Sequence, residues 1–212
     1  NYSAINNFAV REARGEYLLF LNNDVEIITE SWLEEMLQLC QQKDVGMAGA
    51  KLYYPDDTIQ HAGVVVGLGG VAAHVLCKLP RDAEGYMGRL RCVQEISAVT
   101  AACMMVKTSV FKAVGGFDEE LKVAFNDIDL CMKVRKYGVK IVFTPYAELY
   151  HYESKSRGME DTPEKQLRFS REVNCFRRKW ERELLKGDPY YNPNLTLNNT
   201  DCSLRKQEKN GD

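Results

Sequence analysis

A polar triplet ends the first strand that the sequence predicts. Residues 17–21 form a continuous apolar run of strand length, which stops at Asn22-Asn23-Asp24. Ligands of open α/β sheets bind beyond the carboxyl ends of strands, so the carboxylate of Asp24 is placed to meet one. An oxygen ligand of this kind suits a hard divalent cation, although a plain polar turn has the same composition.

Two further carboxylates occupy the predicted start of a helix over residues 127–137. Asp127 and Asp129 lie where the helix dipole and the free backbone N–H groups stabilise negative charge. One of them is sufficient as a helix cap. Because residues two apart point to different sides of a helix, one substrate cannot contact both, and Asp127 is the stronger catalytic candidate.

The third candidate cluster begins at His151, directly after an apolar segment. It continues through Glu153, Ser154, Ser156 and Arg157 to a glycine. An imidazole, hydroxyl groups and a guanidinium together suit a diphosphate group or a metal ion. A single histidine is, by itself, more often a structural residue.

The elements that carry these clusters alternate between helix and strand, which predicts an α/β fold with a mostly parallel central sheet flanked by helices. Glycines at 15 and 138 have the position of helix C-terminal caps. The stretch over residues 67–91 has little periodicity and predicts a mobile loop. Residues 1–187 therefore form the expected domain, and the polar tail over residues 188–212 is expected to be partly disordered.

Composition narrows the function classes further. The chain has 212 residues, 45% apolar and 27% charged, which is enough for one sizeable core. Its formal net charge of −2 argues against nucleic acid as a partner.

No apolar run reaches the roughly 18 to 20 residues of a membrane span. Seven scattered cysteines and the absence of a leader predict reduced thiols and a cytoplasmic location.

The motifs also occur in an order that resembles a known family. They are Asn22-Asn23-Asp24, Lys51-Leu52, Asp57-Thr58-Ile59-Gln60-His61-Ala62-Gly63, Gly115-Gly116-Phe117-Asp118-Glu119, Asn126-Asp127-Ile128-Asp129-Leu130 with Arg135, and His151-Tyr152-Glu153-Ser154 with Ser156-Arg157-Gly158. Over residues 1–180 this pattern is similar to the family-2 nucleotide-sugar glycosyltransferases of GT-A fold, in particular the rhamnosyltransferase-like branch.

The resemblance implies an inverting transferase that moves a sugar from a UDP- or dTDP-sugar to a polysaccharide or a lipid-linked acceptor in cell-surface glycan synthesis. Asp127 matches the general base, and Asp24 and His151 match ligands of Mg²⁺ or Mn²⁺. The donor-binding positions that it implies are Asn22, Asp24, Ser154 and Arg157, and the acceptor-binding positions are His61, Gly116 and Asn126.

Two positions depart from the family pattern, because Asn22 and Asn126 stand where acids are usual. The first strands of the fold and the nucleotide-base pocket are also not visible, so we expect this chain alone to be weak or inactive. A sugar nucleotidyltransferase and a non-catalytic binding module on the same fold remain alternatives.

A predicted helix that begins at Thr162-Pro163 carries one basic face. This face is expected to be solvated, or to rest on anionic lipid or a lipid-linked acceptor at the inner face of the membrane.

Overall fold

The computed structural model describes residues 1–153 and 162–206. The helices are α1 (Tyr2–Glu12), α2 (Trp32–Cys40), α3 (Thr108–Ala113), α4 (Asn126–Tyr137), α5 (Pro163–Lys179) and α6 (Glu181–Lys186), with 3₁₀ turns η1 (Leu68–Gly70) and η2 (Tyr86–Arg91). The strands are β1 (Tyr17–Leu21), β2 (Val25–Ile27), β3 (Val45–Tyr53), β4 (Ile59–His61), β5 (Val64–Val66), β6 (Ala72–His74), β7 (Gln94–Glu95), β8 (Cys103–Lys107) and β9 (Lys140–His151).

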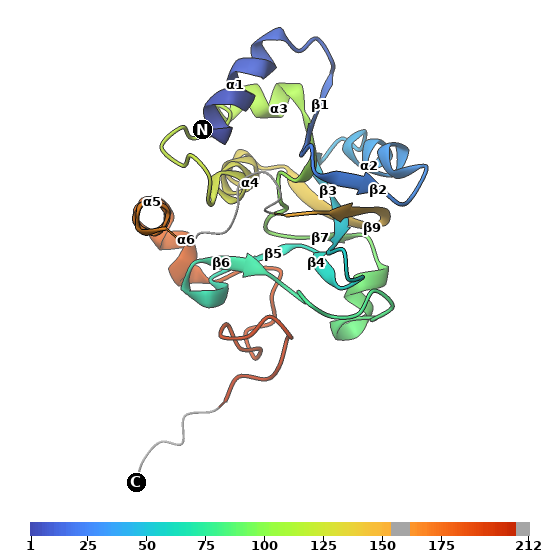
Figure 1. The fold of residues 1–212 in the computed structure, drawn as a ribbon, viewed down its shortest axis with the longest axis vertical. Helices are drawn as coiled ribbons and strands as arrows, with labels where there is room; N and C mark the ends of the chain where they lie inside the picture. Colours follow the sequence, from blue (N-terminus) through green and yellow to red (C-terminus); the bar gives the residue numbers. More distant parts are fainter. Residues whose placement is uncertain (154–161, 207–212) are drawn as a thin grey trace.

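The central sheet confirms the α/β class, but its strand directions differ from those expected. The order is β1-β8-β3-β9-β2, with β4 paired to β3 and β7 paired to β9 (Figure 1). Of these ladders, β3 with β9 is parallel, and the others are antiparallel. The expectation of a mostly parallel sheet is therefore wrong. The apolar run of β1 suggested a central strand, yet β1 lies at one end of the sheet order, and a run of this length does not define its direction.

Hydrophobic packing covers both faces of the sheet. All nine residues of β3 are buried, and they alternate between two cores. Ala48, Ala50 and Leu52 pack with α2, whereas Met47 and Tyr53 pack on the other face with residues of α3 and α4. Burial on both faces makes β3 the centre of the fold.

Strand β9 runs for twelve residues and continues past Pro145 to His151. Its pairing with β3 shifts register: Gly49 lies opposite Phe143, but Lys51 lies opposite Glu148. The extra residues of β9 form a bulge, in which a proline does not break the ladder. The second half of β9 then carries His151 to the site described below.

Helix α4 begins where the chain is fixed by a buried carboxylate from α5. Glu172 is 2% exposed, and it accepts hydrogen bonds from the backbone N–H groups of Lys122 (2.9 Å), Val123 (3.1 Å) and Ala124 (3.0 Å). These residues lead directly into α4, so Glu172 fixes the helix start. At the other end, Gly138 adopts φ 99° as the left-handed cap that the sequence predicts.

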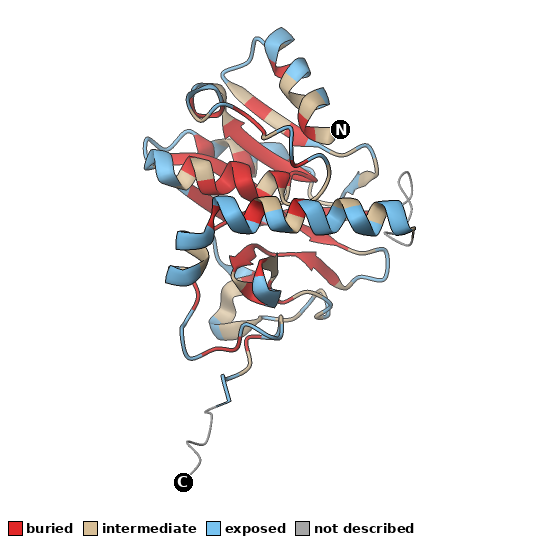
Figure 2. Ribbon diagram, turned by 90° about the vertical axis from the view of Figure 1, so that its left-hand side faces the viewer, coloured by how far each residue is buried: buried red, intermediate tan, exposed pale blue. Residues whose placement is uncertain are grey.

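Helix α5 lies across one side of the molecule, with its outward face exposed (Figure 2). Thr162 caps its first turn by accepting a hydrogen bond from the backbone N–H of Lys165. Trp180 lies at the junction where α5 ends and α6 begins. Within the described residues, no helix combines the length and the apolar character needed to cross a membrane.

The stretch over residues 67–91, expected to be a mobile loop, and the tail, expected to be partly disordered, both pack against the rest of the protein where the structure describes them. In the stretch over residues 67–91, Val71, Val75, Leu76 and Leu90 are buried. The tail is held through residue 206; for example, the backbone N–H of Leu76 donates to the carbonyl of Thr200. The remaining tail residues, 207–212, lie outside the described part.

Glu172→Gln should lower the free energy of unfolding by about 1–3 kcal/mol, because a neutral amide with one acceptor oxygen leaves buried N–H groups without good partners. Urea denaturation measures this change. The same substitution at exposed Glu30 is the control and should have an effect within about 0.5 kcal/mol. Equal stability of both variants would show that Glu172 does not anchor the start of α4.

Candidate functional site

The pairing of β2 with β9 brings Asp24 and His151 together. Val25 lies directly opposite His151 in this antiparallel ladder, so the preceding residue, Asp24, reaches the same imidazole. The distance from Asp24 Oδ1 to His151 Nε2 is 3.3 Å. Asn22 joins them, since its Nδ2 lies 3.1 Å from the same Nε2. The structure therefore brings three of the predicted residues into one cluster, although Asn22 and His151 are 129 positions apart along the chain.

The hydrogen bonds of Gln60 determine where His151 carries its proton. Gln60 Nε2 donates to the backbone carbonyl of His151 at 3.2 Å, which orients the amide so that Gln60 Oε1 lies 2.6 Å from His151 Nδ1. A carbonyl oxygen only accepts, so Nδ1 bears the proton. In the neutral ring, Nε2 is then an acceptor, and its lone pair faces the amide nitrogen of Asn22. Burial lowers the pKa of His151 despite the opposing effect of Asp24, which favours this neutral form.

The Asp24–His151 pair has the chemistry of a divalent cation site. Asp24 Oδ1 is buried and has no hydrogen-bond partner, and it faces the lone pair of Nε2. Two electron-rich atoms in contact are stabilised by a cation between them. Adjacent ligands of an ion with bonds of about 2.1 Å lie about 3 Å apart, close to the observed separation.

The protein supplies only part of a coordination shell. Among residues 1–153 and 162–206, no group of three or more His, Cys, Asp or Glu side chains is arranged to hold a metal ion. Asp24 and His151 thus fit an ion whose remaining ligands come from elsewhere, such as the oxygens of a diphosphate.

Asp127 occupies the first turn of α4 and is half-buried. Its Oδ2 accepts a hydrogen bond from the backbone N–H of Ala101 at 3.2 Å, and its Oδ1 accepts one from the N–H of Ile128 at 2.8 Å. These bonds hold the carboxylate in one orientation. Burial lowers the pKa of His74, whereas the negative charges of Asp127 and Glu153 act to raise it.

Asp129 points into the protein and has a structural role. It is fully buried, and its Oδ1 accepts from Trp180 Nε1 at 2.8 Å and from Lys179 Nζ at 2.8 Å. Lys133 Nζ lies 3.3 Å from Oδ2. The prediction that the two aspartates serve different faces of the helix is therefore confirmed, and Asp127 alone of this pair is partly exposed.

The three predicted acceptor positions differ in their surroundings. His61 is fully buried, so it can act on an acceptor only through a neighbour. Asn126 is 4% exposed and its Nδ2 donates to the carbonyl of Val123, which is a local contact at the helix start.

Gly116 is the third of these positions, and it lies in a tight turn. It has φ +67°, and a Cβ there would lie 2.7 Å from Asn7 Oδ1 and 3.0 Å from the ring of Phe111. The close packing explains the glycine without an acceptor. Ser154 and Arg157, the other predicted donor positions, lie outside the described residues.

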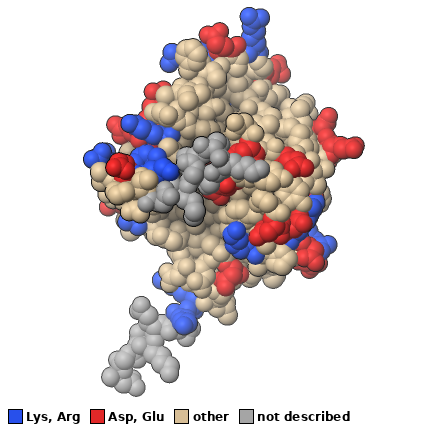
Figure 3. All heavy atoms as spheres, in the orientation of Figure 1, with Lys and Arg blue, Asp and Glu red and all other residues tan. Residues whose placement is uncertain are grey.

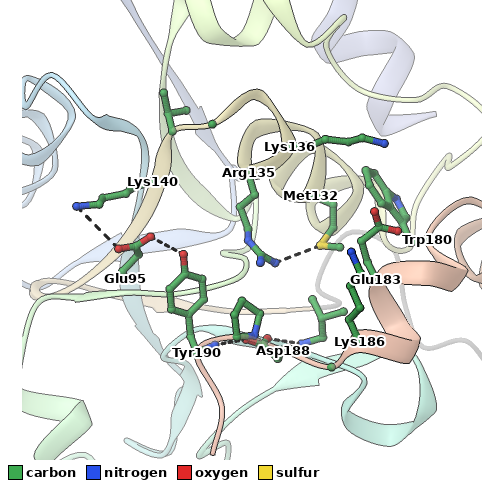
Figure 4. A pocket seen from close by; sticks show the side chains of 15 residues that line it. Glu95, Met132, Arg135, Lys136, Lys140, Trp180, Glu183, Lys186, Asp188 and Tyr190 are labelled. Atoms are coloured by element: carbon green, nitrogen blue, oxygen red, sulfur yellow. Dashed lines mark hydrogen bonds and ion pairs between the residues drawn. The ribbon is translucent and has the colours of Figure 1, made fainter.

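A separate cavity of about 650 Å³ lies between the second half of α4, the start of α6 and the tail (Figure 4). Arg135, part of the family-like pattern, lines this cavity, where it donates to Ser97 Oγ at 3.0 Å and stacks over the ring of Tyr190. None of the residues that line it belongs to the Asp24–His151 pair or is Asp127. Arg135 therefore supports the far end of α4 and does not contact the candidate site.

Sequence reasoning missed the residues that orient the site. Gln60 orients His151, and the consecutive N–H groups of Thr100 and Ala101 orient His61 and Asp127. Gln60 belongs to the motif Asp57-Thr58-Ile59-Gln60-His61-Ala62-Gly63, and membership of this motif was the sequence signal that could have identified it. Backbone N–H groups leave no signal in residue type, so their role is visible only in the fold.

Comparisons with known proteins give the family and the fold. The model of the glycosyltransferase like family matches residues 1–172. The chain is 57% identical over 205 residues to the uncharacterized protein y4gI of Sinorhizobium fredii, covering 96% of this chain and 22% of that protein. It is 42% identical over 213 residues to the O-antigen biosynthesis protein RfbC of Myxococcus xanthus, covering 100% of this chain and 16% of that protein.

The chain thus spans about a fifth of the length of these two relatives. Among solved structures, it is similar to GalNAc-T7 with UDP, GalNAc and Mn²⁺. The TM-score is 0.59 at 13% identity, with 86% of this chain and 35% of that chain covered. This similarity shows that the fold is GT-A. Because the family model matches most of the chain, the protein belongs to the glycosyltransferase like family.

Proposed function

We propose that the protein containing this chain is an inverting, metal-dependent glycosyltransferase. It transfers a sugar from a UDP- or dTDP-sugar to a polysaccharide or lipid-linked acceptor in cell-surface glycan synthesis. The observation that carries the proposal is the buried, unpartnered Asp24 Oδ1 beside the lone pair of His151 Nε2. Family membership, the name of RfbC and the Mn²⁺ bound by GalNAc-T7 support it.

In this mechanism, Asp24 and His151 would hold Mg²⁺ or Mn²⁺ together with the donor diphosphate, and Asn22 would contribute a neutral side chain to the donor. When bound, such an ion would supply positive charge to offset the negative charge of the leaving diphosphate. Asn22 in place of an acid leaves a weaker protein site, so donor and ion are expected to bind together. Ser154 and Arg157 are the further donor contacts that we assign to this half of the site.

Asp127 is the general base in our proposal. Its carboxylate takes the proton of the acceptor hydroxyl as that oxygen attacks the anomeric carbon, and the bond from this carbon to the diphosphate oxygen breaks. Attack from the side opposite the leaving group inverts the configuration. The N–H groups of Ala101 and Ile128 hold the base in place, so it is already oriented when the acceptor arrives.

The exposed face of α5 is the surface that we assign to anionic lipid. Leu167 is 53% exposed and Phe169 is 42% exposed, and exposed Arg171 and Arg178 lie on the same helix. Figure 3 shows basic side chains gathered on the side of the molecule where Figure 1 places α5 and α6. Not all of the basic face is available, because Lys179 pairs with Asp118 and Asp129.

Asp127→Asn should reduce the turnover of the intact protein by about 10²- to 10⁴-fold, since an amide does not accept the proton. Calorimetry with Mn²⁺ and nucleotide should show unchanged binding. Asp129→Asn, two residues along the same helix, is the control: it should lower the melting temperature while turnover per folded molecule changes little. Unchanged turnover of Asp127→Asn would overturn the assignment of the base.

Asp24→Asn should weaken Mn²⁺ binding in the presence of UDP or dTDP by at least about tenfold, because it removes the charged ligand. Electron paramagnetic resonance of free Mn²⁺ measures the affinity. Glu26→Gln is a matched control, since Glu26 is exposed in β2, two residues after Asp24, and the substitution removes the same charge. If both variants bind Mn²⁺ equally, the ion does not lie at Asp24.

The double substitution of Arg171→Glu and Arg178→Glu should reduce binding to vesicles that contain phosphatidylglycerol by about tenfold or more, since each basic residue near such a surface contributes about 1 kcal/mol. Co-sedimentation measures binding. Vesicles of phosphatidylcholine alone serve as the control, and binding that is independent of both lipid charge and these arginines would exclude the surface.

A further inference from the structure

The histidines that the cation site does not use form a pair beside the candidate base. His61 Nδ1 and His74 Nδ1 lie 2.9 Å apart, and their rings meet edge to face with centroids 4.9 Å apart at 80°. His61 belongs to β4 and His74 to β6. Together with His151, these are all three histidines of the chain. In addition to burial, His74 and His151 both lower the pKa of His61, and His151 also lowers the pKa of His74.

The protons of this pair follow from its neighbours. The backbone N–H of Thr100 donates to His61 Nε2 at 3.4 Å. An N–H group only donates, so the neutral ring of His61 carries its proton on Nδ1 and donates it to His74 Nδ1. His74 therefore accepts at Nδ1, and its own proton lies on Nε2. The backbone N–H of Thr100 thus determines the tautomer of His61, and His61 in turn determines that of His74.

The same loop positions the pair relative to Asp127. Thr100 donates to His61, and the next residue, Ala101, donates to Asp127 Oδ2. Two consecutive amides hold the histidine pair and the candidate base. His61 is fully buried, whereas His74 is partly exposed. Of the two residues, His74 is therefore the less buried.

Both rings are kept in the neutral form. Burial lowers the pKa of His61 and of His74. Asp127 and Glu153 oppose this effect at His74, as does the backbone carbonyl of Gln60, while His151 reinforces it. A neutral donor is useful here, because an imidazolium would form an ion pair with Asp127 and weaken it as a base.

We propose that His74 is an acceptor-binding residue whose Nε2–H donates to an oxygen of the acceptor saccharide next to Asp127, and that His61 is the positioning residue that fixes this donor. The inference rests on the proposed glycosyl transfer. It also revises the expected role of His61, which acts through His74 and does not touch the acceptor. With Nε2 protonated, His74 orients the hydroxyl group and leaves its proton to Asp127.

The tautomers can be measured on the folded chain without any substrate. Long-range ¹H–¹⁵N spectra of the imidazole rings at neutral pH contain signals from three histidines. We expect His61 to be protonated at Nδ1 and His74 at Nε2. His61→Leu should convert His74 to a mixture of tautomers, whereas His61→Asn, which retains a donor near the position of Nδ1, should preserve Nε2–H. A wild-type His74 protonated at Nδ1 would overturn the proposal.

The role in transfer is tested in the intact protein, with a UDP- or dTDP-sugar as donor and methyl glycosides as acceptor probes. His74→Phe should raise the KM of the acceptor about tenfold, as expected for one lost hydrogen bond, with a small effect on hydrolysis of the donor by water. His74→Gln, which restores a donor, should recover much of the loss.

An acceptor KM that His74→Phe leaves unchanged would contradict the acceptor role, as would equal losses in acceptor transfer and donor hydrolysis. This result is distinguishable from failure of the proposed function. If Asp127→Asn abolishes transfer while His74→Phe leaves the acceptor KM unchanged, the transferase assignment stands and only the role of His74 is excluded.

Discussion

The parallel ladder between β3 and β9 is the constraint on which the candidate site depends. Strand β3 is buried along its whole length, so its register against β9 is strongly specified by packing on both faces. Strand β4 pairs with the end of β3, with His61 opposite Leu52, and β2 pairs with the end of β9. Gln60 and Asp24 therefore approach His151 from two sides, although neither belongs to the central ladder.

The proton positions in the site are determined by backbone groups that can only donate or only accept a hydrogen bond. The Gln60 amide is oriented by the His151 carbonyl and then determines the tautomer of His151. The Thr100 N–H determines the tautomer of His61 and thereby that of His74. In a buried environment an incorrect proton position leaves a donor or acceptor unpaired, which costs about 1–3 kcal/mol. These chains of contacts thus select one arrangement of protons.

The sequence predicted the local elements well because their signals are local. The helix over residues 127–137, its glycine cap and the position of Asp24 after an apolar strand all agree with the structure. Strand direction was not predictable, because an apolar run has the same composition in a parallel and an antiparallel strand. The contact between Asp24 and His151 depends on that direction and on the bulge of β9 near Pro145, so residue types alone could not establish it.

The start of α4 places two aspartates in different environments within three residues. Asp127 and Asp129 differ by about 200° around the helix axis, so the carboxylate of Asp127 is half-buried, whereas that of Asp129 faces the interior. Asp129 binds Trp180 and Lys179 at the junction of α5 and α6, and Glu172 of α5 binds the backbone before α4. Both contacts join α4 to the same helix. The position of α4 is therefore fixed by groups other than the Asp127 carboxylate, whose two oxygens are oriented by two backbone N–H groups. In the proposed mechanism, this oriented carboxylate takes the proton of the acceptor.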